Sequence, residues 1–154
     1  WVRPECQAAL HPAVISWGLD QGFTTEFDLV GTRDPSPWLA APAALELLAE
    51  FGAEEVRAYN HDLAWQAGER LARRWGTEFR TPRSMVASMV SVPLPERFGG
   101  SAAEAARLRD ALLFEERIEL HIAARGDRLA ARVAIQIYND LADVDRLGEA
   151  IAKR

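Results

Sequence analysis

A β-hairpin that leads into a capped helix is the feature of this sequence that most constrains the fold. Between residues 118 and 124, apolar side chains alternate with more polar ones, as is typical of a half-buried strand. A tight turn is predicted at residues 125–128 (Arg-Gly-Asp-Arg), followed by a return strand over residues 129–137. Asn139 or Asp140 then caps a final helix. We therefore expect two antiparallel strands and a helix at the end of the chain.

Two helices are predicted before this hairpin. The first begins at Pro37 with Ser36 as its cap, or after Pro42, and it ends at Gly52. The second covers residues 53–75 and is closed by a glycine. Its predicted apolar stripe consists of Val56, Tyr59, Leu63, Ala67, Leu71 and Trp75.

A further strand and helix complete the predicted fold. Residues 85–93 are rich in β-branched side chains and lie between two prolines, so they are expected to form a strand. Ser101 and Glu104 have the spacing of a capping box and predict the start of a helix. The predicted class is α+β (α/β two-layer), with a three-stranded, mostly antiparallel sheet and helices packed on one face.

An irregular connecting segment is expected ahead of this domain. Residues 1–35 are interrupted by prolines and glycines, whereas residues 36–154 carry the periodic patterns of a small α+β domain. The aromatic residues in or just beyond the segment are Trp1, Trp17, Phe23, Phe27 and Trp38. They supply more apolar surface than a solvated linker should carry. We expect them to pack against protein outside this chain.

Arg132 is the strongest candidate for a binding residue. It lies in the predicted return strand, on the side that carries Ala130 and Ala134, while Val133 and Ile135 lie on the more apolar side. A guanidinium group can hold a carboxylate through two parallel hydrogen bonds, which makes a small carboxylic acid a plausible ligand. An ion pair with a neighbouring Asp or Glu is the structural alternative.

Composition excludes several classes of function. The formal net charge is −5, from 18 basic and 23 acidic residues, so no broad basic face is available for nucleic acid. No apolar run approaches the roughly 18 residues of a membrane span, so we expect no membrane partner. Cys6 is the single cysteine, so no internal disulfide can form and a cytoplasmic location is expected.

No metal site is predicted. His11, His61 and His121 are fifty or more residues apart and lack neighbouring ligands at metal-binding spacing. His61 is expected to be a polar helix residue, and His121 a structural histidine whose hydrogen bonds are satisfied rather than a group that supports the cleft. Cys6 is expected to be a buried or half-buried thiol.

Two runs of sequence resemble a known family. Residues 27–35 read Phe-Asp-Leu-Val-Gly-Thr-Arg-Asp-Pro, and residues 132–140 read Arg-Val-Ala-Ile-Gln-Ile-Tyr-Asn-Asp. Together they resemble the C-terminal part of class V aminotransferase-type (fold type I) enzymes that use pyridoxal phosphate. The similarity is greatest to the isopenicillin N epimerase-like branch, and it covers nearly the whole chain.

The resemblance implies roles for three residues. The Gly31-Thr32 pair is expected to contact the cofactor phosphate of a neighbouring subunit, and Arg132 is expected to bind the carboxylate of a small amino-acid substrate. It also implies a homodimer and an N-terminal large domain of the same protein, to whose end residues 1–35 would belong. Related cysteine desulfurases place a nucleophilic cysteine just before this arginine. Residues 121–128 contain none here, so desulfurase chemistry is disfavoured.

The chain contains one lysine, Lys153, beside its C-terminus. A pyridoxal enzyme needs a lysine amine for its Schiff base, and in the resembling family that lysine precedes the segment represented here. The 154 residues are therefore expected to be an inactive C-terminal fragment, with no catalytic residue and weak or absent cofactor binding. Arginine dominance among the basic residues suggests a bacterial source.

Three functions are open for the parent protein. The first is an amino-acid epimerase that removes an α-proton, as the isopenicillin N epimerase-like resemblance implies. The second is a carbon–sulfur lyase of the same family, which shares the first step. The third is a non-catalytic α+β interaction module, which the lack of a suitable lysine favours and the presence of Thr32 and Arg132 disfavours.

Overall fold

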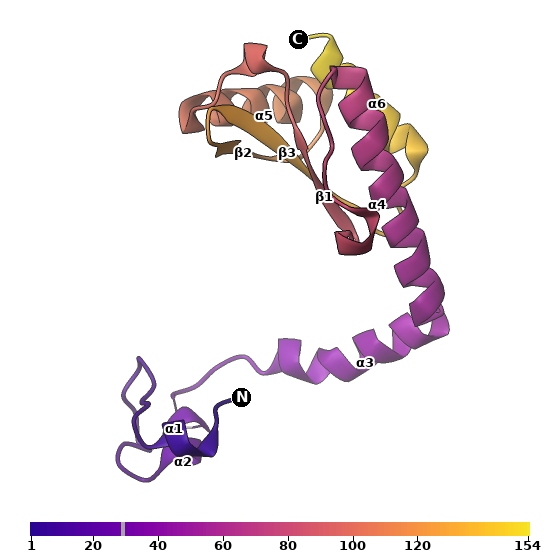
Figure 1. Cartoon of the computed structure of the whole chain (residues 1–154). Coiled ribbons are helices and arrows are strands. Elements are labelled where there is room, and N and C mark those ends of the chain that lie inside the picture. The colour runs from indigo at the N-terminus through magenta and orange to yellow at the C-terminus, as the bar shows by residue number, and fades with distance from the viewer. Residues whose placement is uncertain (29) are drawn as a thin grey trace. The chain divides into compact units, whose positions relative to one another are not determined.

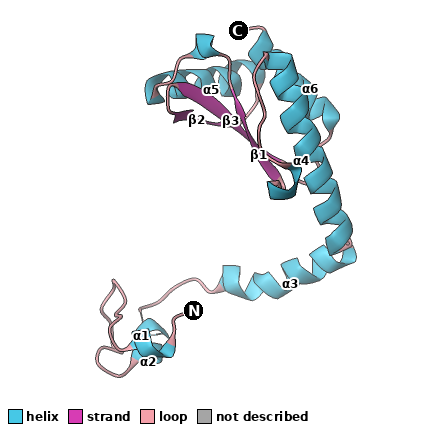
Figure 2. Cartoon of the chain, viewed as in Figure 1, coloured by secondary structure: helices cyan, strands magenta, loops and turns pink. Residues whose placement is uncertain are grey.

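The computed structural model describes residues 1–28 and 30–154, which divide by contacts into two compact units, 1–46 and 47–154. Figures 1 and 2 show the helices and strands. The division falls inside helix α3 (Ser36–Glu50), whereas the predicted boundary lies between residues 35 and 36. That the first part belongs to a large cofactor domain stays a prediction.

The first unit contains two short helices joined by irregular chain. Helix α1 is Pro4–Gln7 and helix α2 is Phe23–Asp28. Trp1 and Trp17 are almost fully exposed, while Phe23 and Phe27 stack with their ring centroids 4.5 Å apart. The segment is thus largely irregular, as predicted, and its tryptophans find no cover within the described residues.

Helix α3 begins one residue earlier than the first of the two predicted starts. Because Ser36 is the first helical residue, it is not the cap. Its backbone N–H instead donates to the Asp34 carboxylate at 2.9 Å. Pro42 lies inside the helix, and no residue of α3 is buried.

The second unit contains the predicted three-stranded sheet. Its strands are β1 (Met89–Pro93), β2 (His121–Arg125) and β3 (Arg128–Ala134), in the order β1-β3-β2, and both pairings are antiparallel. Gly126 has a φ of 63° in the hairpin turn, a backbone conformation that glycine adopts at low cost. The return strand was predicted to extend to residue 137, but β3 ends at Ala134, and Ile137 is 40% exposed.

The strand predicted over residues 85–93 is shorter in the structure. A 3-10 turn, η1 (Arg83–Met85), occupies its expected start, and a second such turn, η2 (Glu96–Phe98), follows β1. Val90 and Val92 are buried, whereas Met89 is exposed. The alternation that predicted a strand therefore holds over five residues.

Three helices cover one face of the sheet. They are α4 (Ala53–Trp75), α5 (Ala102–Glu116) and α6 (Leu141–Ala152). The side chains that the sheet and helices bury together include Val92, Ala131, Val133, Ile122, Leu71, Leu112 and Ile151. This confirms the predicted α+β class, with helices packed on one face of the sheet.

The predicted ends of α4 and the predicted starts of α5 and α6 are confirmed, whereas one residue of the predicted α4 stripe is not buried. Ser101 with Glu104 forms a capping box at the start of α5, and Asp140 with Asp143 forms another at the start of α6. Tyr59 was predicted to face the core, but it is 44% exposed, and Asn60 is buried beside it instead.

Helices α4 and α6 lie side by side (Figure 1). The Arg70 guanidinium donates two hydrogen bonds to the Asp145 carboxylate, at 2.6 and 2.7 Å. The Trp75 indole N–H donates to the Gly148 carbonyl at 3.2 Å. Among the described residues, no helix has the length and apolar composition required to cross a membrane.

Candidate anion-binding site on the open face of the sheet

Arg132 lies in the middle of the central strand, on the face that the helices leave open. Alternation along β3 buries Ala131 and Val133 and exposes Arg132, as predicted. In the strand register, Arg132 is directly opposite Ser91 of β1 and His121 of β2. Directly paired residues project to the same face, so these three side chains form a row across the sheet.

Arg132 has no acidic partner among the residues that the structure describes. Some other arginines of the second unit are paired, including Arg70 with Asp145 at 2.6 Å. The guanidinium group of Arg132 takes part in no ion pair or side-chain hydrogen bond within the described chain. The alternative of a structural ion pair is therefore not realised in this chain, and the donors of Arg132 are available to a ligand.

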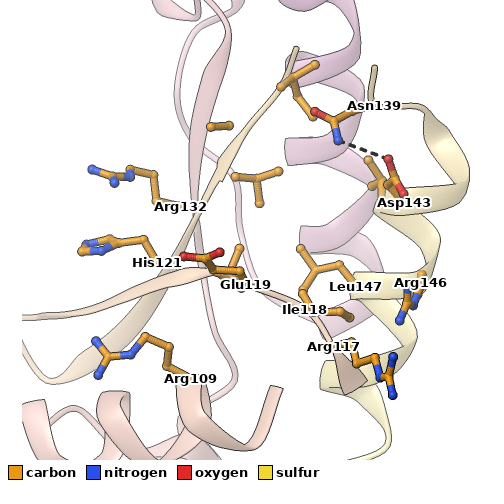
Figure 3. A pocket seen from close by; sticks show the side chains of 15 residues that line it. Arg109, Arg117, Ile118, Glu119, His121, Arg132, Asn139, Asp143, Arg146 and Leu147 are labelled. Atoms are coloured by element: carbon orange, nitrogen blue, oxygen red, sulfur yellow. Dashed lines mark hydrogen bonds between the residues drawn. The ribbon is translucent and has the colours of Figure 1, made fainter. Parts of the chain in front are cut away.

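A cavity of about 660 Å³ lies beside this row (Figure 3). Its charged lining consists of Arg109, Arg117, Arg132, Arg146, Glu119 and Asp143. Arginine thus outnumbers carboxylate four to two around the space. A volume of this size is typical of small-molecule sites, and its charge favours an anionic ligand.

Asn139 in the loop after β3 lines the cavity, and this loop is held by hydrogen bonds from helix α4. The Tyr59 hydroxyl donates to the Asn139 carbonyl at 2.7 Å, and the Asn60 amide donates to Gln136 Oε1 at 3.0 Å. Asn139 in turn accepts from the Gln136 backbone N–H at 3.0 Å and donates to Asp143 at 3.2 Å. These contacts fix the loop that follows the arginine.

Sequence reasoning did not identify the role of Asn60. The only signal was its position four residues after Val56, in line with the apolar stripe of α4. A buried polar residue in such a stripe must find a partner, and Asn60 finds Gln136.

Gly31 and Thr32, the predicted phosphate contacts, lie in the first unit and are exposed. Gly31 has a φ of 104°, and a side chain there would meet no neighbour within 4 Å. Hydrogen bonds from Ser36 lower the pKa of nearby Asp34. Leu29, part of the same sequence run, lies outside the described residues. Gly31 and Thr32 belong to the first unit and Arg132 to the second, so a common role for these residues stays a prediction.

The sequence-based predictions for His61, His121 and Cys6 are confirmed in one case and wrong in two. His61 is a polar helix residue as predicted, hydrogen-bonded to the Val86 carbonyl at 2.9 Å. His121 is exposed and makes no side-chain hydrogen bond in the described part of the chain, so its interpretation as a satisfied structural histidine is wrong. Cys6 was expected to be at least half-buried, but it is exposed because α1 buries no side chain.

His11 is the third histidine, and it pairs with a buried carboxylate. Its Nδ1 lies 2.7 Å from Oε2 of Glu26, which is only 5% exposed. The Asp20 backbone N–H donates to the other Glu26 oxygen at 3.1 Å. Within the described residues, no group of three or more His, Cys, Asp or Glu side chains could hold a metal ion.

Longer curated proteins match almost the whole chain. A probable chloroplastic L-cysteine desulfhydrase of Arabidopsis thaliana is 36% identical over 155 residues, covering 94% of this chain and 33% of the relative. An isopenicillin N epimerase of Streptomyces clavuligerus is 34% identical over 123 residues, covering 79% of this chain and 30% of the relative. The chain spans about a third of the length of these relatives. A search against family models found no match.

The chain belongs to the class V aminotransferase-type family, and it corresponds to the C-terminal part of the longer relatives. Its relatives within that family are L-cysteine desulfhydrases and isopenicillin N epimerases. Because plant proteins are among them, the expected bacterial source is not supported over a plant one.

Proposed function

We propose that the chain is the substrate-carboxylate-binding part of a pyridoxal-phosphate enzyme that removes the α-proton of an amino acid, with epimerisation as the outcome. The observation that carries this proposal is Arg132, an exposed arginine without an acidic partner in the described chain, beside a cavity rich in arginine. The matches to isopenicillin N epimerases support the same assignment.

The residues present fit part of what the cofactor requires. Gly31 leaves open space beside an exposed Thr32 hydroxyl, which suits a phosphate contact. Lys153 lies just past the end of α6 and does not line the cavity, so the Schiff-base lysine would lie in the rest of the protein. When bound, pyridoxal phosphate acts as an electron sink for the α-carbon of an amino acid.

Arg132 would orient the substrate for this chemistry. Two parallel hydrogen bonds from its guanidinium fix both oxygens of the α-carboxylate, which limits rotation about the bond to the α-carbon. The loop from Gln136 to Asn139, held by Tyr59 and Asn60, would keep the end of β3 in place. An N-terminal large domain and a second subunit would supply the remaining groups, and a cytoplasmic location stays a prediction.

Carbon–sulfur cleavage is the second candidate, because several relatives are named L-cysteine desulfhydrases. It shares removal of the α-proton and differs in the next step. Return of a proton to the opposite face gives the epimer, whereas departure of sulfur from the β-carbon gives the lyase products. Deuterium from heavy water in a recovered amino acid would indicate the first outcome, and released sulfide the second.

The test uses the full-length protein. After incubation with pyridoxal phosphate and borohydride reduction, we expect mass spectrometry to find the label on a lysine outside these 154 residues. Arg132→Lys keeps the positive charge but loses the planar guanidinium that makes two parallel hydrogen bonds. The KM for the amino acid should therefore rise about 10- to 100-fold, while labelling of the lysine by the reduced cofactor stays unchanged.

Arg125→Lys, an exposed arginine of the same hairpin, is the matched control and should leave KM unchanged. Absence of any lysine label, or a label confined to Lys153, would remove the enzymatic proposal. The chain would then be a non-catalytic interaction module.

A further inference from the structure

Arg132 and His121 form a basic pair on the open face of the sheet. They are directly opposite in the register of β3 and β2. Cβ atoms of such pairs lie about 4.5–5.5 Å apart, so one ligand can contact both side chains. Neither side chain has an acidic partner among the described residues, so the pair has the character of a binding site.

Arg109 adds a third basic group from a different element. It lies on α5, is exposed, and lines the same cavity. Figure 3 shows that Arg109, His121 and Arg132 extend to the same side. The nearest carboxylate to Arg109 is that of Asp110, its neighbour in sequence, at 3.7 Å. This distance exceeds that of a hydrogen bond, so Arg109 keeps its donors for another partner.

The acidic side chains of the cavity do not neutralise these groups. Asp143 accepts from Asn139 at 3.2 Å and completes the capping box of α6. Glu119 is the other lining carboxylate, and it forms no ion pair in the described chain. A single substrate carboxylate at Arg132 would leave Arg109 with no hydrogen-bonded anion, only the 3.7 Å contact with Asp110.

We propose that Arg109 and His121 form a second anion-binding subsite beside Arg132, so that the amino-acid substrate carries a second carboxylate. This rests on the proposed function, because Arg132 must hold the α-carboxylate. The second carboxylate accepts hydrogen bonds from the Arg109 guanidinium, which keeps its charge at all physiological pH values. The imidazole of His121 lies between Arg109 and Arg132, so it can contact either carboxylate of the substrate. The subsite therefore selects dicarboxylic amino acids over cysteine, which has a single carboxylate.

The test measures binding of unreactive acids to the full-length protein by calorimetry. The probes are three pairs of equal chain length: succinate with butyrate, glutarate with valerate, and adipate with hexanoate. Without an amino group they cannot enter the reaction. We expect the diacid of at least one pair to bind about tenfold more tightly than its partner, the effect of one additional charge-assisted contact.

Variants assign this preference to residues. Arg109→Gln should abolish it and leave binding of the monoacid unchanged, and His121→Asn should weaken it. Arg107→Gln, on the same helix and also exposed, should retain it. Arg132→Gln should weaken binding of both acids.

Two results would overturn the subsite. One is equal binding of both acids in all three pairs, and the other is a preference that survives both Arg109→Gln and His121→Asn. If Arg132→Gln still weakens binding in those cases, the carboxylate role of Arg132 stands without the subsite. If Arg132→Gln has no effect and no lysine is labelled by borohydride, the proposed function itself fails.

Discussion

Arg132 combines an exposed guanidinium that has no acidic partner in the described chain with a position on the lining of a cavity. The paired examples are Arg70 with Asp145, Arg74 with Glu149, Arg83 with Asp62, and Arg128 with Glu96. Exposed pairs of this kind contribute little stability. Other exposed arginines, such as Arg107 and Arg125, have no carboxylate partner in the described chain. Arg132 has none, and its neighbours across the sheet are a serine and a histidine. That arrangement favours ligand binding over a structural role.

His11 and Glu26 give a prediction of pH dependence. The hydrogen bond to Glu26 raises the pKa of His11 above its ordinary value of about 6.5. A raised folded-state pKa means that protonated His11 stabilises the first unit fully below about pH 6.5. This contribution is lost as the pH rises through the raised pKa.

An NMR titration of the His11 ring checks the direction of this shift. We expect a pKa above 6.5 in the native chain and a return towards the ordinary value in Glu26→Gln. Glu5→Gln, which removes an exposed carboxylate of the same unit, should leave the titration unchanged. If the pKa of His11 were the same in the native chain and in Glu26→Gln, Glu26 would not be the cause of the raised pKa.

Elements whose ends are encoded locally were predicted well from sequence. Each capping box, the closing Gly76 and the hairpin turn involve residues within a few positions of one another, so their signals are visible without tertiary information. Tyr59 was assigned to the buried face incorrectly and the burial of Asn60 was not predicted, because which residues of α4 are buried depends on the loop after β3. Strand ends were also missed, since pairing with a neighbour sets where a strand stops.

A residue just before α5 lies very close to the turn of the β2–β3 hairpin. A Cβ on Gly100, just before α5, would lie 2.3 Å from the Asp127 backbone oxygen in the β-hairpin turn. The added methyl group would meet backbone atoms, which cannot move aside as a flexible side chain can. Gly100→Ala should therefore destabilise the second unit by about 1–3 kcal/mol. Urea unfolding measures the change. Ala103→Ser, at an exposed position nearby, should stay within about 0.5 kcal/mol of the native chain. Equal midpoints for both variants would contradict the close packing.

At the scale of the whole molecule, the two units differ in how much apolar surface they cover. The second unit buries a core of aliphatic side chains from the sheet and three helices. The first unit and α3 leave Trp1, Trp17 and Trp38 at least 79% exposed. Exposed aromatic surface on this scale is typical of regions that contact other protein. The relatives are about three times longer than the chain, which is consistent with such cover in the parent.

The isolated chain should therefore bind pyridoxal phosphate weakly. Without a Schiff base, phosphate contacts from Gly31 and Thr32 remain exposed to water and contribute little affinity. Absorbance titration should show no saturation of this chain at cofactor concentrations that saturate the full-length protein. Tight, saturable binding by the 154 residues alone would mean that the Schiff-base centre lies within them.

The sequence by itself determined the class of fold, the hairpin, the helix ends and the exposed side of Arg132, because periodicity and capping act over a few residues. It also carried the family resemblance. Only the tertiary structure decided that Arg132 lacks an acidic partner in the described chain, and that Arg109 and His121 lie beside it. Such groupings depend on strand register and on how α5 packs along β2, and both join residues that are far apart in the chain.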